Sequence, residues 1–262
     1  MKHKLFFLLF AFCSLLIANS CSKHDPILPG DRTPVFPSDE QITSKGNIPE
    51  SVLSDSFAKI AVAAPQTQFT QNLNNEIFDV SDSANPRKIF AGFPSDSKIN
   101  VSHAPLFFEN YVFAGLTTGE VVKVNPKNRE VAWVADVYKS VDMLGGNTVL
   151  DIVAPIIIDN ERLFAGGMGG EFCSLKITTG DKKWCREIAV AVPFQIAGDL
   201  AFVVGTDDTL SALDANRGEI YWKAKIQKQS TPKLMSSDGK YFVIVGKEKF
   251  DAQTGKNLAN SV

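Results

Sequence analysis

Two cysteines in the second half of the chain are placed to react with each other. Cys173 and Cys185 flank the turn Thr178–Asp181, and the midpoint between them, position 179, falls inside that turn. Residues at matched distances from a hairpin turn face each other at a separation that a disulfide can bridge. In an oxidising compartment we expect a bond; the alternative is two buried thiols that pack as small apolar side chains.

The acidic pair Asp207-Asp208 is the one carboxylate cluster that invites a catalytic interpretation. It lies where a two-residue turn must join two strands, however, and aspartate tolerates the backbone geometry of such turns. The glycine-rich segment 166–170 also joins two strands and contains neither lysine nor serine, so it is no phosphate loop or nucleophile elbow. We therefore predict no catalytic residues and no enzyme activity.

Histidine is too scarce to build a metal centre. The chain has three histidines, His3, His24 and His103; the first lies in the leader described next and the second in the segment that follows it. Zinc sites need three or four protein ligands that converge. The sequence predicts no metal site and no cofactor.

The first twenty residues have the layout of a secretory signal peptide. Lys2 and Lys4 precede a run of thirteen almost entirely apolar residues, Leu5 to Ile17, and small or polar residues lead to Cys21. This run is shorter than the roughly 20 residues that a membrane-spanning helix needs, so we assign residues 1–20 to a removable signal.

The residues around Cys21 resemble the lipobox of bacterial lipoproteins, in which the cysteine is acylated after cleavage; Ala18 stands where leucine is usual. Two or three acyl chains would anchor the chain stably, whereas cleavage near Ser20 without acylation would leave a free thiol. Because Ser22 stands where an aspartate retains such lipoproteins in the inner membrane, the resemblance implies the periplasmic face of the outer membrane.

Composition divides the remaining chain in two. Residues 21–64 are rich in proline, serine, aspartate and lysine without a sustained apolar period, which predicts a flexible tether, although residues 50–64 could form a short helix. Residues 65–262 suffice for one large β domain. The net charge of −2 gives no electrostatic reason to expect a nucleic-acid partner.

The second part of the chain is an internal repeat. Four segments align, beginning at Ala104, Ala154, Val192 and Thr231, with prolines at 105, 155, 193 and 232 and tryptophans at 133, 184 and 222. Successive prolines are 50, 38 and 39 residues apart, and periods near 40 are typical of propeller blades of four strands.

These observations predict an all-β chain, a β-propeller with four-stranded blades near 104–140, 154–190, 192–228 and 231–262 and a partial blade in 65–103. Within a unit, short apolar runs alternate with turns that carry glycine, asparagine or aspartate. The last unit lacks the tryptophan. Four to five blades could close into a small ring, remain an open or incomplete arc, or belong to a shortened gene product.

The run 213–222 (LDANRGEIYW) and its echo 175–184 (LKITTGDKKW) resemble the quinoprotein-type propeller repeat. Together with the leader, residues 65–262 are similar to the BamB family, the propeller lipoproteins of the β-barrel assembly machinery. The similarity is greatest for residues 150–172 and 192–214, which look like the last blades of the α-proteobacterial form. Members of the family have eight blades, more than this chain supplies.

The resemblance implies a non-catalytic scaffold that binds the outer-membrane β-barrel insertase and its periplasmic domains and assists assembly of outer-membrane proteins. Docking would use loops between blades, here Met143 to Ile152, with Leu144 and Leu150 as apolar contacts and Asp151 as a polar one. An equally plain interpretation of these residues is a solvated connection. The alternatives are a quinoprotein-like enzyme or its degenerate relative, and a propeller with an unrelated periplasmic partner.

Overall fold

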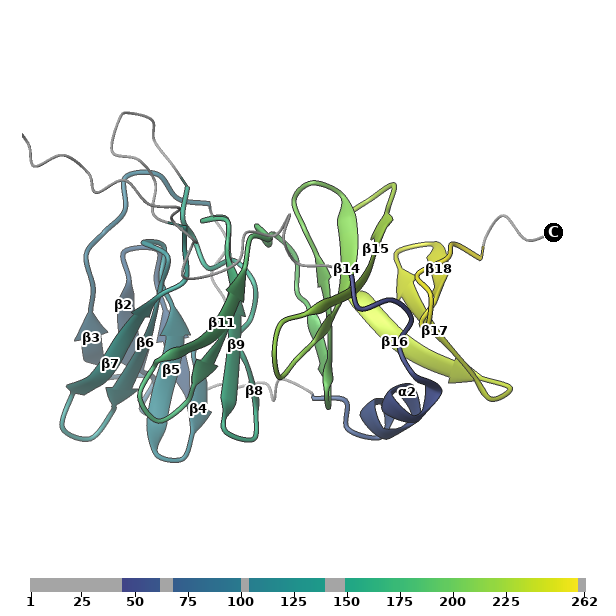
Figure 1. The fold of residues 1–262 in the computed structure, drawn as a ribbon. Coiled ribbons are helices and arrows are strands. Elements are labelled where there is room, and N and C mark those ends of the chain that lie inside the picture. The colour runs from purple at the N-terminus through teal and green to yellow at the C-terminus, as the bar shows by residue number, and fades with distance from the viewer. Residues whose placement is uncertain (1–43, 62–67, 100–103, 140–148, 259–262) are drawn as a thin grey trace, which may run out of the picture. The chain divides into compact units, whose positions relative to one another are not determined.

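The computed structural model describes residues 44–61, 68–99, 104–139 and 149–258 (Figure 1). Almost all regular structure in these ranges is β: eighteen strands form five antiparallel sheets that follow one another in chain order. Helix α2 (Glu50–Phe57) is the only helix in the described ranges. No helix there is long and apolar enough to cross a membrane.

Each sheet is one blade, and its strands pair in sequence order. Blade 1 contains β1 (Phe69–Gln71), β2 (Glu76–Asp79) and β3 (Arg87–Ala91). Blade 2 contains β4 (Leu106–Phe108), β5 (Tyr111–Gly115), β6 (Glu120–Asn125) and β7 (Glu130–Asp136). Blade 3 contains β8 (Ile157–Asp159), β9 (Arg162–Gly166), β10 (Phe172–Lys176) and β11 (Lys182–Arg186). Blade 4 contains β12 (Gln195–Ala197), β13 (Leu200–Val204), β14 (Thr209–Asp214) and β15 (Ile220–Lys225). Blade 5 contains β16 (Pro232–Ser237), β17 (Lys240–Val245) and β18 (Glu248–Asp251).

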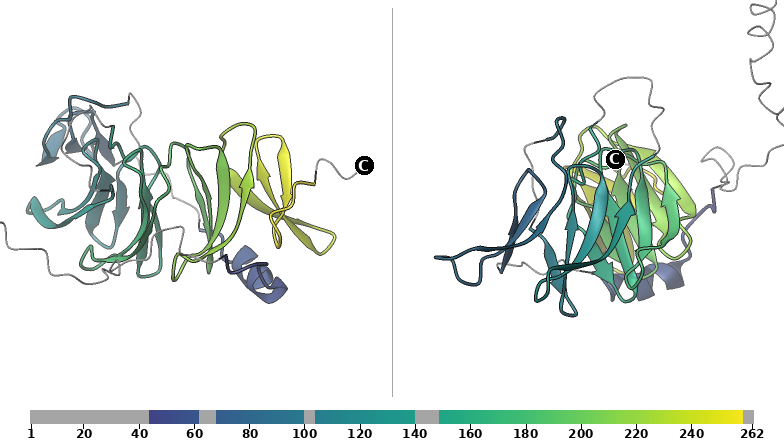
Figure 2. Two further views of the ribbon diagram at one scale, coloured as in Figure 1. Left: turned by 45° about the horizontal axis from the view of Figure 1, so that its top comes forward. Right: turned by 90° about the vertical axis from the view of Figure 1, so that its left-hand side faces the viewer.

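The hydrophobic core lies between the blades rather than within any one of them. Each of the four clusters of buried apolar side chains takes members from two successive blades. No cluster of described residues joins blade 1 to blade 5. The described blades are therefore an open series of pairwise contacts, as expected for repeats that cannot bury both faces alone; Figure 2 shows the successive sheets from two further directions.

One tryptophan on the outer strand of a blade joins that blade to the next. Each indole N–H donates a hydrogen bond to the carbonyl oxygen of the residue that directly follows the third strand of the next blade. The three bonds are Trp133 to Ile177 (3.1 Å), Trp184 to Ala215 (3.1 Å) and Trp222 to Ala252 (3.0 Å). Each large ring is thus buried with its polar N–H satisfied.

A glycine in the accepting turn lets the indole approach. Gly180, Gly218 and Gly255 have φ values of +78°, +69° and +72°, and a Cβ atom on any of them would lie 2.5–2.8 Å from ring atoms of Trp133, Trp184 or Trp222. Only glycine combines this backbone conformation with the missing side chain. The Thr-Gly and Arg-Gly turns of the repeat are therefore parts of the blade-to-blade contact.

Blade 1 contacts blade 2 through different residues. Phe90 pairs with Ile77 immediately before a register shift, which is the register that Trp133 has in blade 2. Phenylalanine has no N–H, and Arg87 supplies it: its Nη2 atom donates to the carbonyl oxygen of Pro126 at 3.0 Å. Pro126 directly follows β6, as Ile177 follows β10, and Phe90 packs against the core cluster of blades 1 and 2. In blade 1 the aromatic ring and the hydrogen-bond donor therefore belong to different residues.

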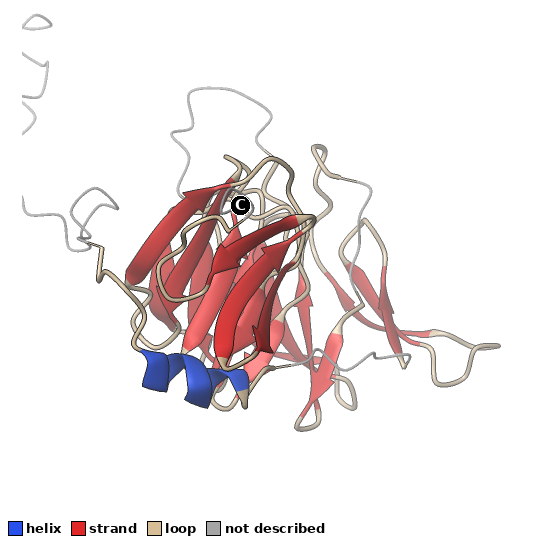
Figure 3. Cartoon of the chain, turned by 90° about the vertical axis from the view of Figure 1, so that its right-hand side faces the viewer, coloured by secondary structure: helices blue, strands red, loops and turns tan. Residues whose placement is uncertain are grey.

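The segment 44–61, predicted to belong to a flexible tether, is instead attached to blades 4 and 5. Ile48 is fully buried in the core cluster of these blades, and Ala61 N donates to Ile196 O at 2.9 Å on β12. Between them, α2 contacts β13 and β16 at one end of the strands (Figure 3). The prediction of flexibility was wrong for these residues. Their partners lie more than 100 positions away in the sequence, so local composition does not reveal the contacts.

Lys45 fixes the start of this segment. Its Nζ atom lies 2.8 Å from Asp214 Oδ2 and 2.9 Å from Glu219 Oε2. Burial raises the pKa of the Asp214 carboxyl, but Lys45 and the backbone N–H groups of Asn216 and Arg217 outweigh burial and hold it below its ordinary value. The same two carboxylates raise the pKa of Lys45.

We predict that Gly218→Ala destabilises the chain more than Gly239→Ala, by about 1–3 kcal/mol, because overpacking costs about that much. Both glycines have positive φ, +69° and +73°, but a Cβ atom would meet Trp184 at 2.6 Å only at position 218 and would meet nothing within 4 Å at position 239. Urea unfolding of both variants measures the difference. Equal losses would show that the indole contact does not depend on glycine.

We predict that Lys45→Met lowers the free energy of unfolding at pH 7 by about 0.5–1 kcal/mol, near the upper end for ion pairs close to the surface, because the Asp214 side chain is only 13% exposed. The pKa of Asp214 is depressed in the folded state, so its stabilisation is present above the unfolded value of about 3.9 and is lost as the pH falls through the folded value. Lys45→Met should therefore be less sensitive to acid than the parent chain in urea unfolding. Lys127→Met, on an exposed lysine of blade 2, is the control that should retain the full acid sensitivity.

Candidate functional site

The turn that joins β1 to β2 in blade 1 lies at the same end of the sheets as the turns that join the second strand to the third in blades 2 to 4. The connections between the early blades lie at this end too. We call this surface the loop face; it comprises residues 72–75, 92–99, 116–119, 149–153, 167–170 and 205–208. Its parts are joined by backbone hydrogen bonds, among them Ile152 N to Leu116 O at 3.1 Å and Met168 N to Asp151 O at 2.9 Å. The loop face is thus a connected surface of the described chain.

Asn75 holds three segments of the loop face together. This residue is fully buried, and its Oδ1 atom accepts hydrogen bonds from Thr117 N (2.8 Å) and Thr117 Oγ1 (3.1 Å). Its Nδ2 atom donates to Phe93 O at 2.7 Å, and its backbone carbonyl accepts from Gly92 N at 2.9 Å. The backbone that carries Phe93 is therefore fixed on two sides.

Phe93 itself points into solvent. Its side chain is 87% exposed, the highest value among the large apolar residues of the described chain. A phenyl ring fully in water costs hydrophobic free energy that a partner could recover by covering it. Phe93 is thus an apolar side chain on a fixed backbone, which is the arrangement of an interface anchor. Phe93 was not predicted from the sequence; its one local signal is its place between Gly92 and Pro94.

The three residues that the sequence predicted as partner contacts, Leu144, Leu150 and Asp151, differ in how far they are exposed to solvent. Leu144 lies outside the described residues. Leu150 is half-buried, and a Cβ atom on Gly119 or Gly169 would lie 3.0 Å or 3.4 Å from its side chain. Leu150 therefore lies between the turns of blades 2 and 3, and its role in partner binding stays a prediction.

Asp151 is buried, contrary to the prediction that it is a polar contact for a partner. Its side chain is 1% exposed, so it cannot be a surface contact. One carboxylate oxygen accepts a hydrogen bond from Ile99 N, and the other has no hydrogen-bond partner among the described residues. Burial raises the pKa of this carboxyl, more than the Ile99 N–H lowers it. Through this hydrogen bond, Asp151 attaches the connection 92–99 to the connection 149–153 and thereby supports the loop face as a buried residue.

Charged side chains border the loop face at blades 3 and 4. A hollow of about 350 Å³ is lined there by residues that include Thr206, Thr209 and Ser211. Lys139 and Glu187 form an ion pair of 2.8 Å across it. Exposed pairs of this kind contribute little stability, but they give the rim of the surface a mixed charge.

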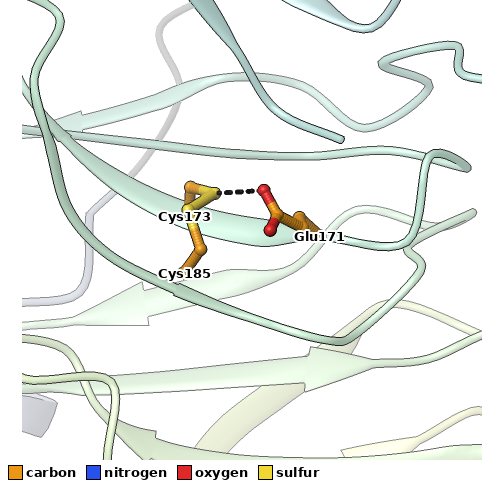
Figure 4. A group of neighbouring side chains, drawn as sticks. All are labelled: Glu171, Cys173 and Cys185. Carbon is orange, nitrogen blue, oxygen red and sulfur yellow. Dashed lines mark hydrogen bonds between the residues drawn. A yellow bond between two sulfur atoms is a disulfide. The ribbon is translucent and has the colours of Figure 1, made fainter. Parts of the chain in front are cut away.

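The predicted pair of cysteines is bonded in the structure. Cys173 and Cys185 are direct register partners on β10 and β11, with Cα atoms 4.1 Å apart. Figure 4 shows Glu171 beside the bridge, with its Oε2 atom 3.6 Å from Cys173 Sγ. The turn symmetry predicted the bridge, whereas the proximity of Glu171 was not predicted.

The profile of one protein family, described as outer membrane protein assembly factor BamB, matches residues 92–224, just over half of the chain. The chain belongs to this family. The match begins beside Phe93 and ends in β15, so it contains the three tryptophans that join the blades. No curated protein matches the sequence.

Solved structures show the same fold. The crystal structure of BamB from Moraxella catarrhalis superposes with a TM-score of 0.55 at 14% identity, over 72% of this chain and 61% of that chain. The quinohemoprotein alcohol dehydrogenase ADHIIG from Pseudomonas putida HK5 gives 0.51 at 13% identity, over 73% and 40%. A europium-containing methanol dehydrogenase gives 0.50 at 10% identity, over 82% and 55%. The chain thus spans about three fifths of the BamB structure, and these likenesses establish the fold alone.

We predict that Asp151→Asn is at least as stable as the parent chain at pH 7, whereas Asp151→Ala loses about 1–3 kcal/mol because the Ile99 N–H is left unpaired. A raised pKa means that the folded state favours the protonated form, so the parent chain loses stability as the pH rises from the unfolded to the folded pKa. Asparagine keeps an acceptor without the charge and should remove this loss. Urea unfolding at pH 4, 5.5 and 7 tests it; an identical pH profile for the parent chain and Asp151→Asn would contradict the assignment.

Proposed function

We propose that this chain is a non-catalytic scaffold lipoprotein of the outer-membrane β-barrel assembly machinery. In this proposal Cys21 carries the lipid anchor on the periplasmic face of the outer membrane, and the propeller binds the insertase and assists assembly of outer-membrane proteins. Family membership supports the general role, since the family is described as an outer membrane protein assembly factor. Exposure of Phe93 on the hydrogen-bonded loop face is the observation that supports a binding role for this surface.

The alternative of a quinone-dependent enzyme draws on the fold of the two dehydrogenases. Members of that class are expected to hold a quinone and calcium, and calcium takes six to eight oxygen ligands. The groove along the inner strands of blades 3 to 5, about 400 Å³ in volume, is lined largely by apolar residues such as Pro155, Ile157 and Leu234. No carboxylate is among its described lining residues, and the amide oxygen of Gln195 already accepts Leu234 N. This donor set does not fit calcium, so the groove gives no support to the enzyme alternative.

The general proposal is tested by affinity purification of the tagged chain from its own membranes in mild detergent, with identification of the proteins that accompany it. Recovery of the β-barrel insertase would support the scaffold role. A folded, outer-membrane-located chain that recovers a different periplasmic partner would favour the unrelated-partner alternative. Uptake of quinone with calcium by the purified chain would favour the enzyme alternative.

We predict that Phe93→Ala lowers recovery of the insertase about 5- to 30-fold, since truncation of an aromatic anchor costs about 1–2 kcal/mol. The matched control is Val134→Ala on β7, another exposed apolar side chain (52%) that lies outside the loop face. Both variants should unfold at the same urea concentration as the parent chain. Equal recovery with the two variants would exclude Phe93 as the anchor while leaving the rest of the proposal open to the first experiment.

A further inference from the structure

Three potential metal ligands meet in blade 3, directly after the loop-face segment 167–170. The nearest ligand atoms of Glu171, Cys173 and Cys185 all lie within 4.8 Å of one another, the one such group among the described residues. Apart from an ion pair with Lys182, Glu171 has no role in the fold or in the proposed function. The group therefore has chemistry that is not yet assigned.

The sheet itself brings these groups together. Cys173 and Cys185 are opposed on adjacent strands, and Glu171 precedes Cys173 by two residues, which places both side chains on one face of an extended chain. Cys173 is fully buried, Cys185 is half-buried, and the Glu171 side chain retains 18% exposure. The site is thus closed on the sulfur side and open to solvent on the carboxylate side.

Lys182 holds the carboxylate in position. Its Nζ atom lies 3.0 Å from Glu171 Oε2, the same oxygen that faces Cys173 Sγ. Two thiolates and one carboxylate would carry three negative charges, which a divalent cation and the Lys182 ammonium group would balance. Uncompensated charge is costly at a partly buried position, so this balance matters.

We propose that, when the disulfide is reduced, Glu171, Cys173 and Cys185 bind one zinc-class divalent cation with water as the fourth ligand. A dithiol or phosphine reductant supplies two electrons and, with solvent, two protons: the S–S bond breaks and two thiols form. Binding of the cation then releases both thiol protons to solvent. Zinc binds thiolates at about 2.3 Å in tetrahedral geometry, so the two sulfurs would lie roughly 3.7 Å apart, a separation that adjacent opposed cysteines reach by side-chain rotation.

Metal binding would preserve the connection that reduction removes. The disulfide links β10 to β11, and Trp184, the neighbour of Cys185 on β11, forms the contact between blades 3 and 4. A cation shared by both strands would add a link between β10 and β11, besides their backbone pairing, before the bond forms or after it is reduced. The pair thus serves as a covalent link under oxidising conditions and as a metal site under reducing ones.

Cobalt(II) is the probe, because thiolate ligands give it a charge-transfer absorption band. The full chain with Cys13→Ser and Cys21→Ser, so that only this pair can supply thiolates, is reduced with a phosphine without oxygen and titrated. We expect one equivalent to bind, displacement by zinc, and no band in the oxidised chain. Cys185→Ser should abolish the band, and Glu171→Gln should weaken binding at least tenfold, whereas Glu161→Gln, at an exposed glutamate of the same blade, should not.

Absence of the band from the reduced chain would overturn the proposal, as would equal affinities of Glu171→Gln and Glu161→Gln. If reduction unfolds the chain, circular dichroism replaces absorption as the measurement. Zinc must then restore the β spectrum of the reduced parent chain but not of Cys185→Ser, and failure to do so would equally overturn the proposal. The outcome does not depend on the proposed function, because no partner is involved.

Discussion

The contact of one aromatic ring with the turn of the next blade is the interaction on which the rest of the structure depends. No blade has a core of its own, so the free energy of folding comes from pairs of blades. An indole across a glycine turn covers the seam and satisfies one N–H and one carbonyl in the same contact. Because the donor always lies in the earlier blade, the contact also gives the series a direction and determines which faces meet.

Most of this arrangement could be predicted from the sequence because it repeats. The tryptophans, the glycine turns and the period near 40 predicted the blades, and the symmetry of one turn predicted the disulfide. Blade 1 contacts blade 2 without the tryptophan, since Phe90 provides the ring and Arg87 the donor. Because two residues of blade 1 replace the single tryptophan, the sequence of this blade does not show the repeated pattern. It could therefore be predicted only as a partial unit.

The remaining differences arise from contacts between distant segments. The composition of residues 44–61 is that of a tether, yet Lys45 meets Asp214 across 169 positions. In the same way Asp151 looked like a solvated loop residue because its partner, the N–H of Ile99, lies 52 positions earlier. Local pattern reports which side chains suit a loop, whereas tertiary packing decides which of them reach solvent, and on the loop face it is Phe93 rather than Asp151.

Blade 5 shows how an aromatic face is protected where no described blade covers it. Lys249 pairs with Ile244 as Lys123 pairs with Phe113 in blade 2, and its Nζ atom lies 3.8 Å from the centre of the Phe242 ring. Lys123 likewise lies over Tyr111 at 4.2 Å while donating to the Ile177 carbonyl of blade 3. The aliphatic part of a lysine covers apolar surface while its ammonium group stays available for polar contacts. A lysine at this position of the third strand therefore suits both a contact between two blades and a blade face that no described blade covers. The outer face of blade 5 therefore has the same lysine and aromatic ring as a contact between blades, and the lysine reduces the apolar surface that this face exposes to solvent.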